Sequence, residues 1–298
     1  MSLIFIFRIG MIVGANLRIY EEVIMYENSL KPALSKADIF SFIGVYDVFS
    51  TTIAAKYFDG IFLSGFGFAA SYYGMPDIGF NTWTDIVAYA QRIKSVAPEC
   101  HILVDIDDGF IDTEVACHVV SLLESIGVSG IIVEDQKRPR RCGHFKGKQI
   151  MEQEAFLRKL EKILAVRKEL FVVARTDAEA EDEIKERALA FADAGADAIL
   201  IDAIENIELV KDLRSQINLP FVFNRIAGGK SPLYSNDELR NAGIKIVVYS
   251  TPCLFAAQMA IDEAMRTLKK GDGLLPTDDK SITVQSCTAI LNNNLKVF

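Results

Sequence analysis

From about residue 38 onward, short apolar runs alternate with longer amphipathic stretches. The apolar runs are rich in β-branched residues, which is typical of strands that are buried on both faces. They cover residues 40–46, 60–63, 101–105, 130–134, 170–175, 198–201, 219–223 and 245–249.

The amphipathic stretches predict helices that connect these strands on the outside of a parallel sheet. The clearest cover residues 82–96, 113–126, 152–168, 182–194 and 206–216. Eight strand–helix units over roughly 230 residues match the size of a (β/α)8 TIM barrel. A doubly wound open sheet is the main alternative, but no glycine-rich phosphate turn follows the first strand. We therefore predict an α/β barrel over residues 31–270, an N-terminal extension of residues 1–30 and a C-terminal tail of residues 271–298.

The chain is acidic, with a formal charge of −8 over 298 residues, which argues against broad nucleic-acid binding. Its five cysteines lack paired short spacings, as expected in a reducing cytoplasm. The apolar start MSLIFIFRIGMIVG is interrupted by Arg8 and is too short to span a bilayer. We expect an extension there rather than a signal peptide or anchor, with Met25 as a candidate initiator. The sequence thus predicts a cytoplasmic protein with no membrane or nucleic-acid partner.

Polar residues mark the ends of the predicted strands, where TIM barrels carry out their chemistry. These ends include Asp47, Ser64, Asp105, Glu134, Arg175, Asp202, Asn224 and Ser250. A barrel without catalytic function would not need this density of polar groups, so we predict an enzyme rather than a binding barrel.

The motif DIDDGF at residues 105–110 concentrates negative charge at one strand end. Asp105 and Asp107 are two residues apart, so in an extended chain they face the same side. Glu134 adds a carboxylate from the next strand. Their mutual repulsion would be relieved by a hard divalent cation, and Mg²⁺ suits oxygen ligands best. The alternative is a solvated acidic turn.

Two further strand ends could bind an anion. The stretch of residues 64–67, Ser-Gly-Phe-Gly, offers backbone N–H groups in a flexible turn to a carboxylate or enolate oxygen. Arg175 ends an apolar strand and should pair with an anion, either the substrate or, alternatively, Asp177 or Asp202.

The segment VEDQKRPRRCGHFKGK at residues 133–148 follows two carboxylates with six cationic side chains. We predict that residues 136–148 form a gating loop, which would neutralise a metal-bound anion and exclude water. Cys142 lies between Arg141 and Gly143, with His144 close by, so we expect a lowered thiol pKa and a role in proton transfer. The alternative is a free surface thiol.

Six motifs together resemble the isocitrate lyase / phosphoenolpyruvate mutase superfamily over roughly residues 30–270. They are GVYD at 44–47, SG at 64–65, DxD at 105–107, VEDQ at 133–136, RRCGH at 140–144 and ARTDA at 174–178. The resemblance implies a TIM barrel whose last helix is swapped between subunits of a homodimer or homotetramer.

The resemblance also implies Mg²⁺, with Mn²⁺ as an alternative, bound mainly through Asp107 or Asp105. Asp77 and Glu134 would act on the metal through waters. The substrate would be a small anionic carboxylate or phosphonate. Its expected contacts are Ser64, Gly65, Phe66, Arg175 and Asn224.

Within this superfamily, carbon–carbon lyases carry a Cys-Gly-His motif whose cysteine protonates the leaving carbanion, whereas phosphoenolpyruvate mutase has Asn there. Cys142 therefore predicts a lyase that cleaves a methylisocitrate- or dimethylmalate-like 2-hydroxy acid to an α-keto acid and a second carboxylate. Tyr46 or a metal-bound water would be the base, and Arg140 and His144 complete the catalytic candidates. The alternatives are a phosphonate-forming phosphoenolpyruvate or carboxyphosphonoenolpyruvate mutase, and an oxaloacetate hydrolase or decarboxylase.

Three departures from the superfamily pattern leave the substrate open. Arg140 stands where the superfamily usually has Lys, and Phe66 replaces a Gly that is common in the lyases. Asp108 and Ile111 alter the usual DTGYG sequence.

Overall fold

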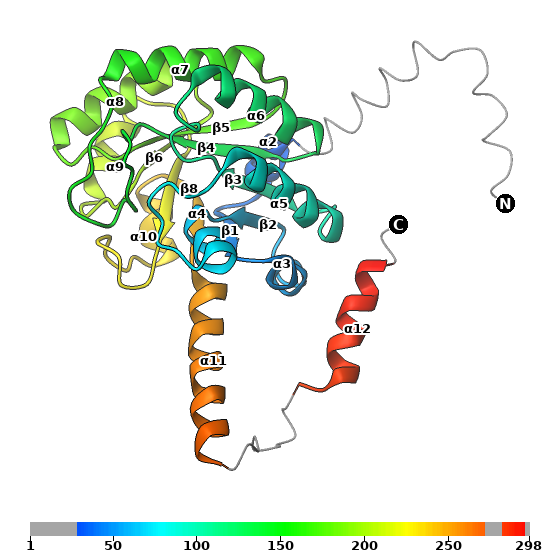
Figure 1. Ribbon diagram of the computed structural model, residues 1–298. Coiled ribbons are helices and arrows are strands. Elements are labelled where there is room, and N and C mark those ends of the chain that lie inside the picture. The colour runs from blue at the N-terminus through cyan, green and yellow to red at the C-terminus, as the bar shows by residue number, and fades with distance from the viewer. Residues whose placement is uncertain (1–28, 272–281, 296–298) are drawn as a thin grey trace, which may run out of the picture.

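A closed parallel barrel forms the body of the protein in the computed structural model, which describes residues 29–271 and 282–295 (Figure 1). Within this part, each strand pairs with the next, and the eighth pairs with the first. The strands are β1 Phe40–Val45, β2 Gly60–Leu63, β3 His101–Asp105, β4 Gly130–Glu134, β5 Phe171–Thr176, β6 Ala198–Ile201, β7 Phe221–Arg225 and β8 Ile244–Tyr249. Each overlaps its predicted run, so the predicted (β/α)8 TIM barrel is confirmed.

Helices surround the barrel and include all five predicted ones. They are α2 Leu30–Lys36, α3 Val48–Ala54, α4 Gly65–Phe68, the π-helix η2 Ala69–Tyr73, α5 Trp83–Val96, α6 Thr113–Ser125, α7 Gln153–Val166, α8 Glu181–Asp193, α9 Glu208–Arg214, α10 Asn236–Asn241, α11 Pro252–Lys270 and α12 Val284–Asn294. Side-chain caps set the starts of α5 and α6, where Thr82 and Asp112 accept hydrogen bonds from backbone N–H groups.

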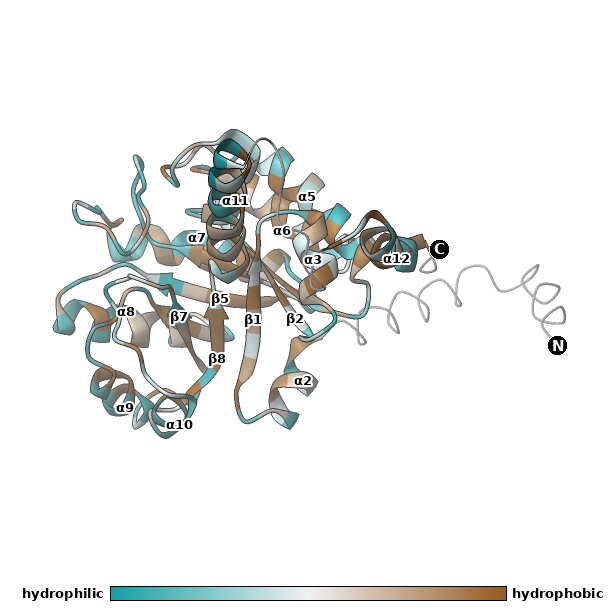
Figure 2. Ribbon diagram, turned by 90° about the horizontal axis from the view of Figure 1, so that it is seen from below, coloured by the Kyte–Doolittle hydropathy of each residue, from teal (hydrophilic) through white to brown (hydrophobic). Residues whose placement is uncertain are grey.

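The strands are buried on both faces because successive side chains alternate between two cores. On β3, Leu103 points into the barrel, whereas Ile102 and Val104 pack toward the helices. Hydropathy colouring shows the hydrophobic residues concentrated along the strands (Figure 2). This double burial explains why the strands appear as continuous apolar runs rather than as alternating patterns.

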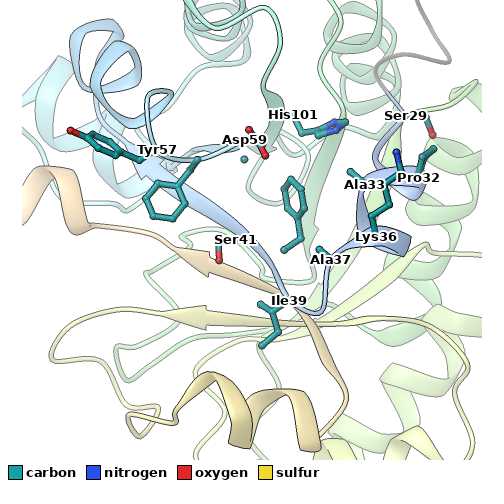
Figure 3. Close-up of a pocket in the computed structure, with 13 residues that line it drawn as sticks. Ser29, Pro32, Ala33, Lys36, Ala37, Ile39, Ser41, Tyr57, Asp59 and His101 are labelled. Carbon is teal, nitrogen blue, oxygen red and sulfur yellow. The ribbon is translucent and has the colours of Figure 1, made fainter.

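The amino end of the barrel is closed by α2, whose Leu30 and Leu34 join the inner core. A pocket of about 720 Å³ lies beside this helix, and Lys36, Asp59 and His101 are among the residues that line it (Figure 3). It is at the opposite end from the polar strand ends, so it is not the predicted site.

The C-terminal helices differ from those between the strands. In Figure 1, α11 extends away from the barrel, and none of its residues is buried. The predicted loose tail contains a helix, α12, which packs beside α3 through a hydrogen bond from Asn294 Nδ2 to Thr52 Oγ1 of 3.0 Å. A capping box between Thr283 and Ser286 starts this helix.

The predicted N-terminal extension lies almost entirely outside the described residues. Across residues 29–271 and 282–295, no helix has both the length and the apolar character that crossing a bilayer requires.

Candidate active site

Four buried carboxylates meet at the carboxyl ends of the strands. They belong to Asp77, Asp105, Asp107 and Glu134, the predicted metal ligands. Gly65, at the start of α4, lies against two of them: a Cβ atom there would be 3.0 Å from Asp105 Oδ2 and 3.2 Å from Asp107 Oδ1. The structure therefore brings the predicted carboxylates together and leaves little room for a side chain at position 65.

The backbone conformation that brings Asp107 into the cluster differs from the extended one that the sequence predicts. Strand β3 ends at Asp105, and Asp107 adopts a left-handed conformation with φ of 50°. Its N–H donates to Asp105 Oδ1 at 3.1 Å, and its carbonyl oxygen accepts from the N–H of Glu134 at 2.9 Å. The expectation of an extended chain was wrong, because a turn rather than strand alternation places both carboxylates on one side.

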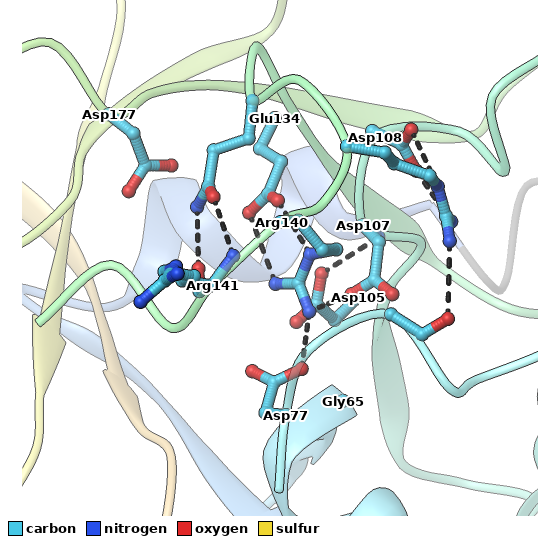
Figure 4. Close-up of polar contacts among 12 residues, drawn as sticks. Gly65, Asp77, Asp105, Asp107, Asp108, Glu134, Arg140, Arg141 and Asp177 are labelled. Carbon is cyan, nitrogen blue, oxygen red and sulfur yellow. Dashed lines mark hydrogen bonds and ion pairs between the residues drawn. The ribbon is translucent and has the colours of Figure 1, made fainter. Parts of the chain in front are cut away.

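Arg140 lies among these carboxylates with only 1% of its surface exposed (Figure 4). Its Nε donates to Glu134 Oε1 at 2.8 Å, and its Nη1 lies 3.2 Å from Asp107 Oδ1 and donates to Asp77. With the guanidinium between them, the acidic, His and Cys side chains of the described residues form no group of three or more arranged to hold a metal ion. Binding an ion there requires Arg140 to shift.

Arg175 also pairs with protein carboxylates. Its Nη2 lies 2.8 Å from Asp202 Oδ2 and 3.3 Å from Glu134 Oε2, and its Nε donates to Asp177 Oδ2 at 2.9 Å. The alternative of an internal ion pair is therefore observed, and Glu134 is a partner that the sequence analysis did not name.

The positive charges of Arg140 and Arg175 do not fully offset the burial of the neighbouring carboxylates. Burial raises the pKa of Asp105, raises that of Asp107 well above its usual value, and raises that of Glu134 to about 7. Both carboxylate oxygens of Asp107 lack a hydrogen-bond partner among the described residues. A buried, unsatisfied carboxylate among other oxygen donors fits a hard divalent cation.

The predicted gating loop, residues 136–148, lies over the mouth of the barrel, and we call it the lid. Arg138 donates to both oxygens of Asp108, with Nη2 2.8 Å from Oδ1 and Nε 3.0 Å from Oδ2. Lys148 Nζ lies 3.3 Å from Asp177 Oδ1. Three of the basic residues of the lid, Arg138, Arg140 and Lys148, therefore pair with acids near the strand ends, which explains part of the density of both charges.

His144 fixes the lid on the side of β7. Its Nδ1 accepts a hydrogen bond of 3.0 Å from the backbone N–H of Lys230. Neutral His144 must then carry its proton on Nε2, which has no hydrogen-bond partner in the described part of the chain.

Cys142 lines the cavity beneath the lid. The pKa of its thiol is raised to about 11, mainly by burial and in part by nearby Asp202 and Asp77. The expectation of a lowered pKa was wrong, because desolvation of the thiol outweighs the effect of the basic groups around it. The thiol is protonated at neutral pH, which suits an acid rather than a base.

The enclosed cavity has a volume of about 30 Å³. Its polar lining comes from Ser64, Asp77, Asp105, Cys142, Arg175, Asp202, Asn224 and Ser250, and its apolar lining includes Phe62, Phe66, Ile132 and Leu200. This volume is far below the roughly 300–1,000 Å³ of typical ligand pockets, so a di- or tricarboxylate does not fit beneath the lid in this conformation.

Ser64 and Tyr46, two predicted site residues, lie in surroundings that differ from those expected. Ser64 lines the cavity, but it caps α4 and accepts from the N–H of Gly67 at 3.1 Å, so this stretch is a helical turn rather than a flexible one. Tyr46 is not among the cavity-lining residues. Burial raises its pKa, with a contribution from Asp47. The role of Tyr46 as a base stays a prediction.

The sequence analysis missed a polar network that lines the same cavity as Asp77 and Asp105. Asn224 Nδ2 donates to Asp202 Oδ1 at 2.7 Å, and Ser250 Oγ donates to Asn224 Oδ1 at 2.6 Å. Asp202 and Ser250 were visible as polar strand ends. Only the closure of the barrel shows that they share Asn224.

A TIM barrel with clustered carboxylates and arginines at the carboxyl ends of its strands is typical of an enzyme. The sequence matches the Phosphoenolpyruvate phosphomutase family over residues 30–269, and the chain belongs to that family. The predicted membership of the isocitrate lyase / phosphoenolpyruvate mutase superfamily is confirmed.

Curated relatives include lyases. The chain is 32% identical to 2,3-dimethylmalate lyase of Eubacterium barkeri, covering 80% of this chain and 85% of that protein. It is 35% identical to 2-methylisocitrate lyase of Halalkalibacterium halodurans, covering 76% of each chain. Among solved structures, oxaloacetate acetylhydrolase with the inhibitor 3,3-difluorooxalacetate superimposes with a TM-score of 0.85 at 27% identity, covering 92% of this chain and 96% of that chain.

Gly143 provides a test of lid closure. A Cβ atom there would lie 1.8 Å from Asp202 Oδ2, so Gly143→Ala should prevent the lid from docking. We expect limited proteolysis to cut residues 137–148 of this variant faster than those of the native protein. Gln149→Ala is the control, because the side chain of Gln149 is exposed just beyond the lid. Equal cutting in all three proteins would contradict this role.

Proposed function

We propose that the protein is an Mg²⁺-dependent lyase that cleaves a carbon–carbon bond of a 2-hydroxy di- or tricarboxylate. The observation that carries this proposal is the protonated thiol of Cys142, which lines the closed cavity together with Arg175. The identity to dimethylmalate and methylisocitrate lyases supports the same chemistry.

The cation would be held by Asp107 and Asp105, with Asp77 and Glu134 acting through waters, and Mn²⁺ could replace Mg²⁺. When bound, such a cation polarises oxygens of the substrate. Arg175 and Asn224 face the same cavity and would bind the substrate's carboxylates. A substrate carboxylate can replace Asp202 as the partner of Arg175, because a guanidinium binds either anion with the same geometry.

Cys142 would act as the acid in the bond cleavage. The bond between the hydroxyl-bearing carbon and its neighbour breaks, and the electron pair moves to the departing carbon. The hydroxyl oxygen gives its proton to a water, which passes it to solvent, and becomes the keto oxygen of the first product. The thiol then gives its proton to the departing carbon, and the thiolate left behind takes a proton back from solvent. No base is assigned, since Tyr46 does not line the cavity.

A phosphonate-forming mutase is the second candidate. Two buried arginines beside a metal cluster could stabilise a migrating phosphoryl group, and the family takes its name from such an enzyme. An oxaloacetate hydrolase is a further alternative, because oxaloacetate acetylhydrolase has the same fold. Cys142 favours the lyase, because a mutase forms no carbanion that needs a proton.

We also propose that α11 is covered by a second copy of this chain, in a homodimer or homotetramer. Ile261 and Met265 are 60% and 54% exposed on this helix, which extends from the barrel in Figure 1. Together with Leu254 and Leu268 they form an apolar face at helical spacing. A cytoplasmic location remains part of the proposal, and the five cysteines are all free in the structure.

Removing the Asp107 charge should abolish metal binding. Asp107→Asn keeps the size of the side chain, and we expect loss of calorimetric Mg²⁺ binding and of turnover with an unchanged circular dichroism spectrum. EDTA should inactivate the native enzyme in the same way. Asp112→Asn, at the exposed cap of α6, should behave like the native protein. Full activity of native enzyme in metal-free buffer would end the metal hypothesis.

Replacing Cys142 distinguishes the two leading reactions. General acid catalysis contributes roughly 10²–10⁴-fold, so Cys142→Ser should slow cleavage by about that factor while KM changes little. The assay compares 2-methylisocitrate, dimethylmalate, oxaloacetate and phosphonopyruvate, following keto acid release and phosphorus NMR signals. Cys117→Ser, on α6, is the matched control. If Cys142→Ser turns over normally while Arg175→Lys is inactive, the mutase replaces the lyase.

Disrupting the apolar face of α11 should change the molar mass in solution. Light scattering should give native protein a multiple of its 33.1 kDa chain mass, and Ile261→Lys should lower that mass. Glu263→Lys introduces the same side chain on the opposite side of α11 and should leave the assembly intact. A monomeric native protein would contradict the proposal.

A further inference from the structure

The turn that carries Asp107 holds four residues in left-handed conformations. The values of φ are 50° at Asp107, 77° at Gly109, 58° at Phe110 and 74° at Ile111. A β-branched residue such as Ile111 rarely adopts this conformation, and only one of the four is glycine. Such residues persist only where their surroundings hold them, and they cluster at functional sites.

Lys159, on α7, contacts this turn. Its Nζ donates to the carbonyl oxygens of Asp108 at 2.7 Å and of Ile111 at 3.1 Å. Its stem packs over Gly109, where a Cβ atom would lie 3.5 Å from Lys159 Cδ. One ammonium group therefore bridges both halves of the turn.

The buried environment of Lys159 disfavours the charged form of its side chain. It is 5% exposed, and it forms no ion pair with a carboxylate in the described part of the chain. Burial lowers its pKa. Lys162, three residues further along the same helix, instead pairs with Glu114 at 2.7 Å near the surface. The carboxylates of Asp108 and Asp112 offset the effect of burial on Lys159 in part, but the hydrogen bonds of the ammonium group go to backbone carbonyl oxygens of the turn.

The other cation at this turn is Arg138, which binds the Asp108 carboxylate from the lid. This contact exists only while the lid is closed. Lys159 belongs to a helix of the barrel, so its contacts remain when the lid opens to admit a metal ion or substrate.

We propose that Lys159 is a positioning residue, which holds the turn of residues 107–111 so that the Asp107 carboxylate is already oriented for a divalent cation. It does not touch the substrate. The inference rests on the proposed metal site, and it adds a residue outside that site to the requirements for binding.

The test uses metal-free full-length protein and the variants Lys159→Met, Lys159→Arg and Lys162→Met. Calorimetry measures Mg²⁺ affinity, and hydrogen exchange measures the amides of residues 107–112. Residues that orient metal ligands typically contribute 10–100-fold to affinity, so Lys159→Met should bind Mg²⁺ about tenfold more weakly, or worse. Its turn amides should exchange faster. Lys159→Arg keeps the charge and the hydrogen-bond donors, so it should retain most of the Mg²⁺ affinity and most of the protection of the turn amides. Lys162→Met should match the native protein in both measurements.

Native affinity and native exchange in Lys159→Met would overturn the proposal. If native protein itself does not bind Mg²⁺, the proposed function fails, and hydrogen exchange alone then decides whether Lys159 holds the turn. If Lys159→Met does not fold, Lys159→Gln replaces it. That variant keeps one donor group on a shorter side chain, and it should show an intermediate loss of affinity.

Discussion

The burial of several carboxylates at one end of the barrel is the constraint on which the rest of the site depends. Asp107 and Glu134 are almost fully desolvated, and a buried charge is costly unless it is paired. Burial raises the pKa of both groups, and neighbouring carboxylates add to the effect, so nearby cations stabilise their charged forms. Arg140, Arg175 and the proposed metal ion are therefore parts of one electrostatic arrangement.

The proposed metal binding would be coupled to lid closure for this reason. Arg140 belongs to the lid, yet it contacts Asp77, Asp107 and Glu134, which are three of the four candidate metal ligands. The lid is attracted to the site by the same charges that attract a cation. A point-charge lysine would satisfy fewer of these partners at once than the planar fork of an arginine. Arg140, where the superfamily usually has Lys, therefore strengthens the attraction between the lid and the buried carboxylates.

The sequence predicted the features that depend on local pattern. The double burial of strands such as β3 produces apolar runs, so the barrel and its strand ends were identified, and the carboxylates of Asp105 and Glu134 were placed together correctly. Features that depend on tertiary packing were not predicted. The raised pKa of Cys142 follows from desolvation under the closed lid, which no neighbour in sequence indicates. The hydrogen bond between Asp202 and Asn224 depends on which strand ends the closed barrel brings together.

The placement of Cys142 on the lid has a consequence for catalysis. An acid on a moving segment reaches the reacting carbon only when the lid is closed, and closure leaves a cavity of about 30 Å³ around it. A thiol with a pKa of about 11 keeps its proton until a strongly basic carbon forms beside it. In the proposed reaction, the same movement of the lid would deliver the acid and exclude water. A carbanion would then be protected from solvent until the thiol protonates it, which is the requirement of a carbon–carbon lyase.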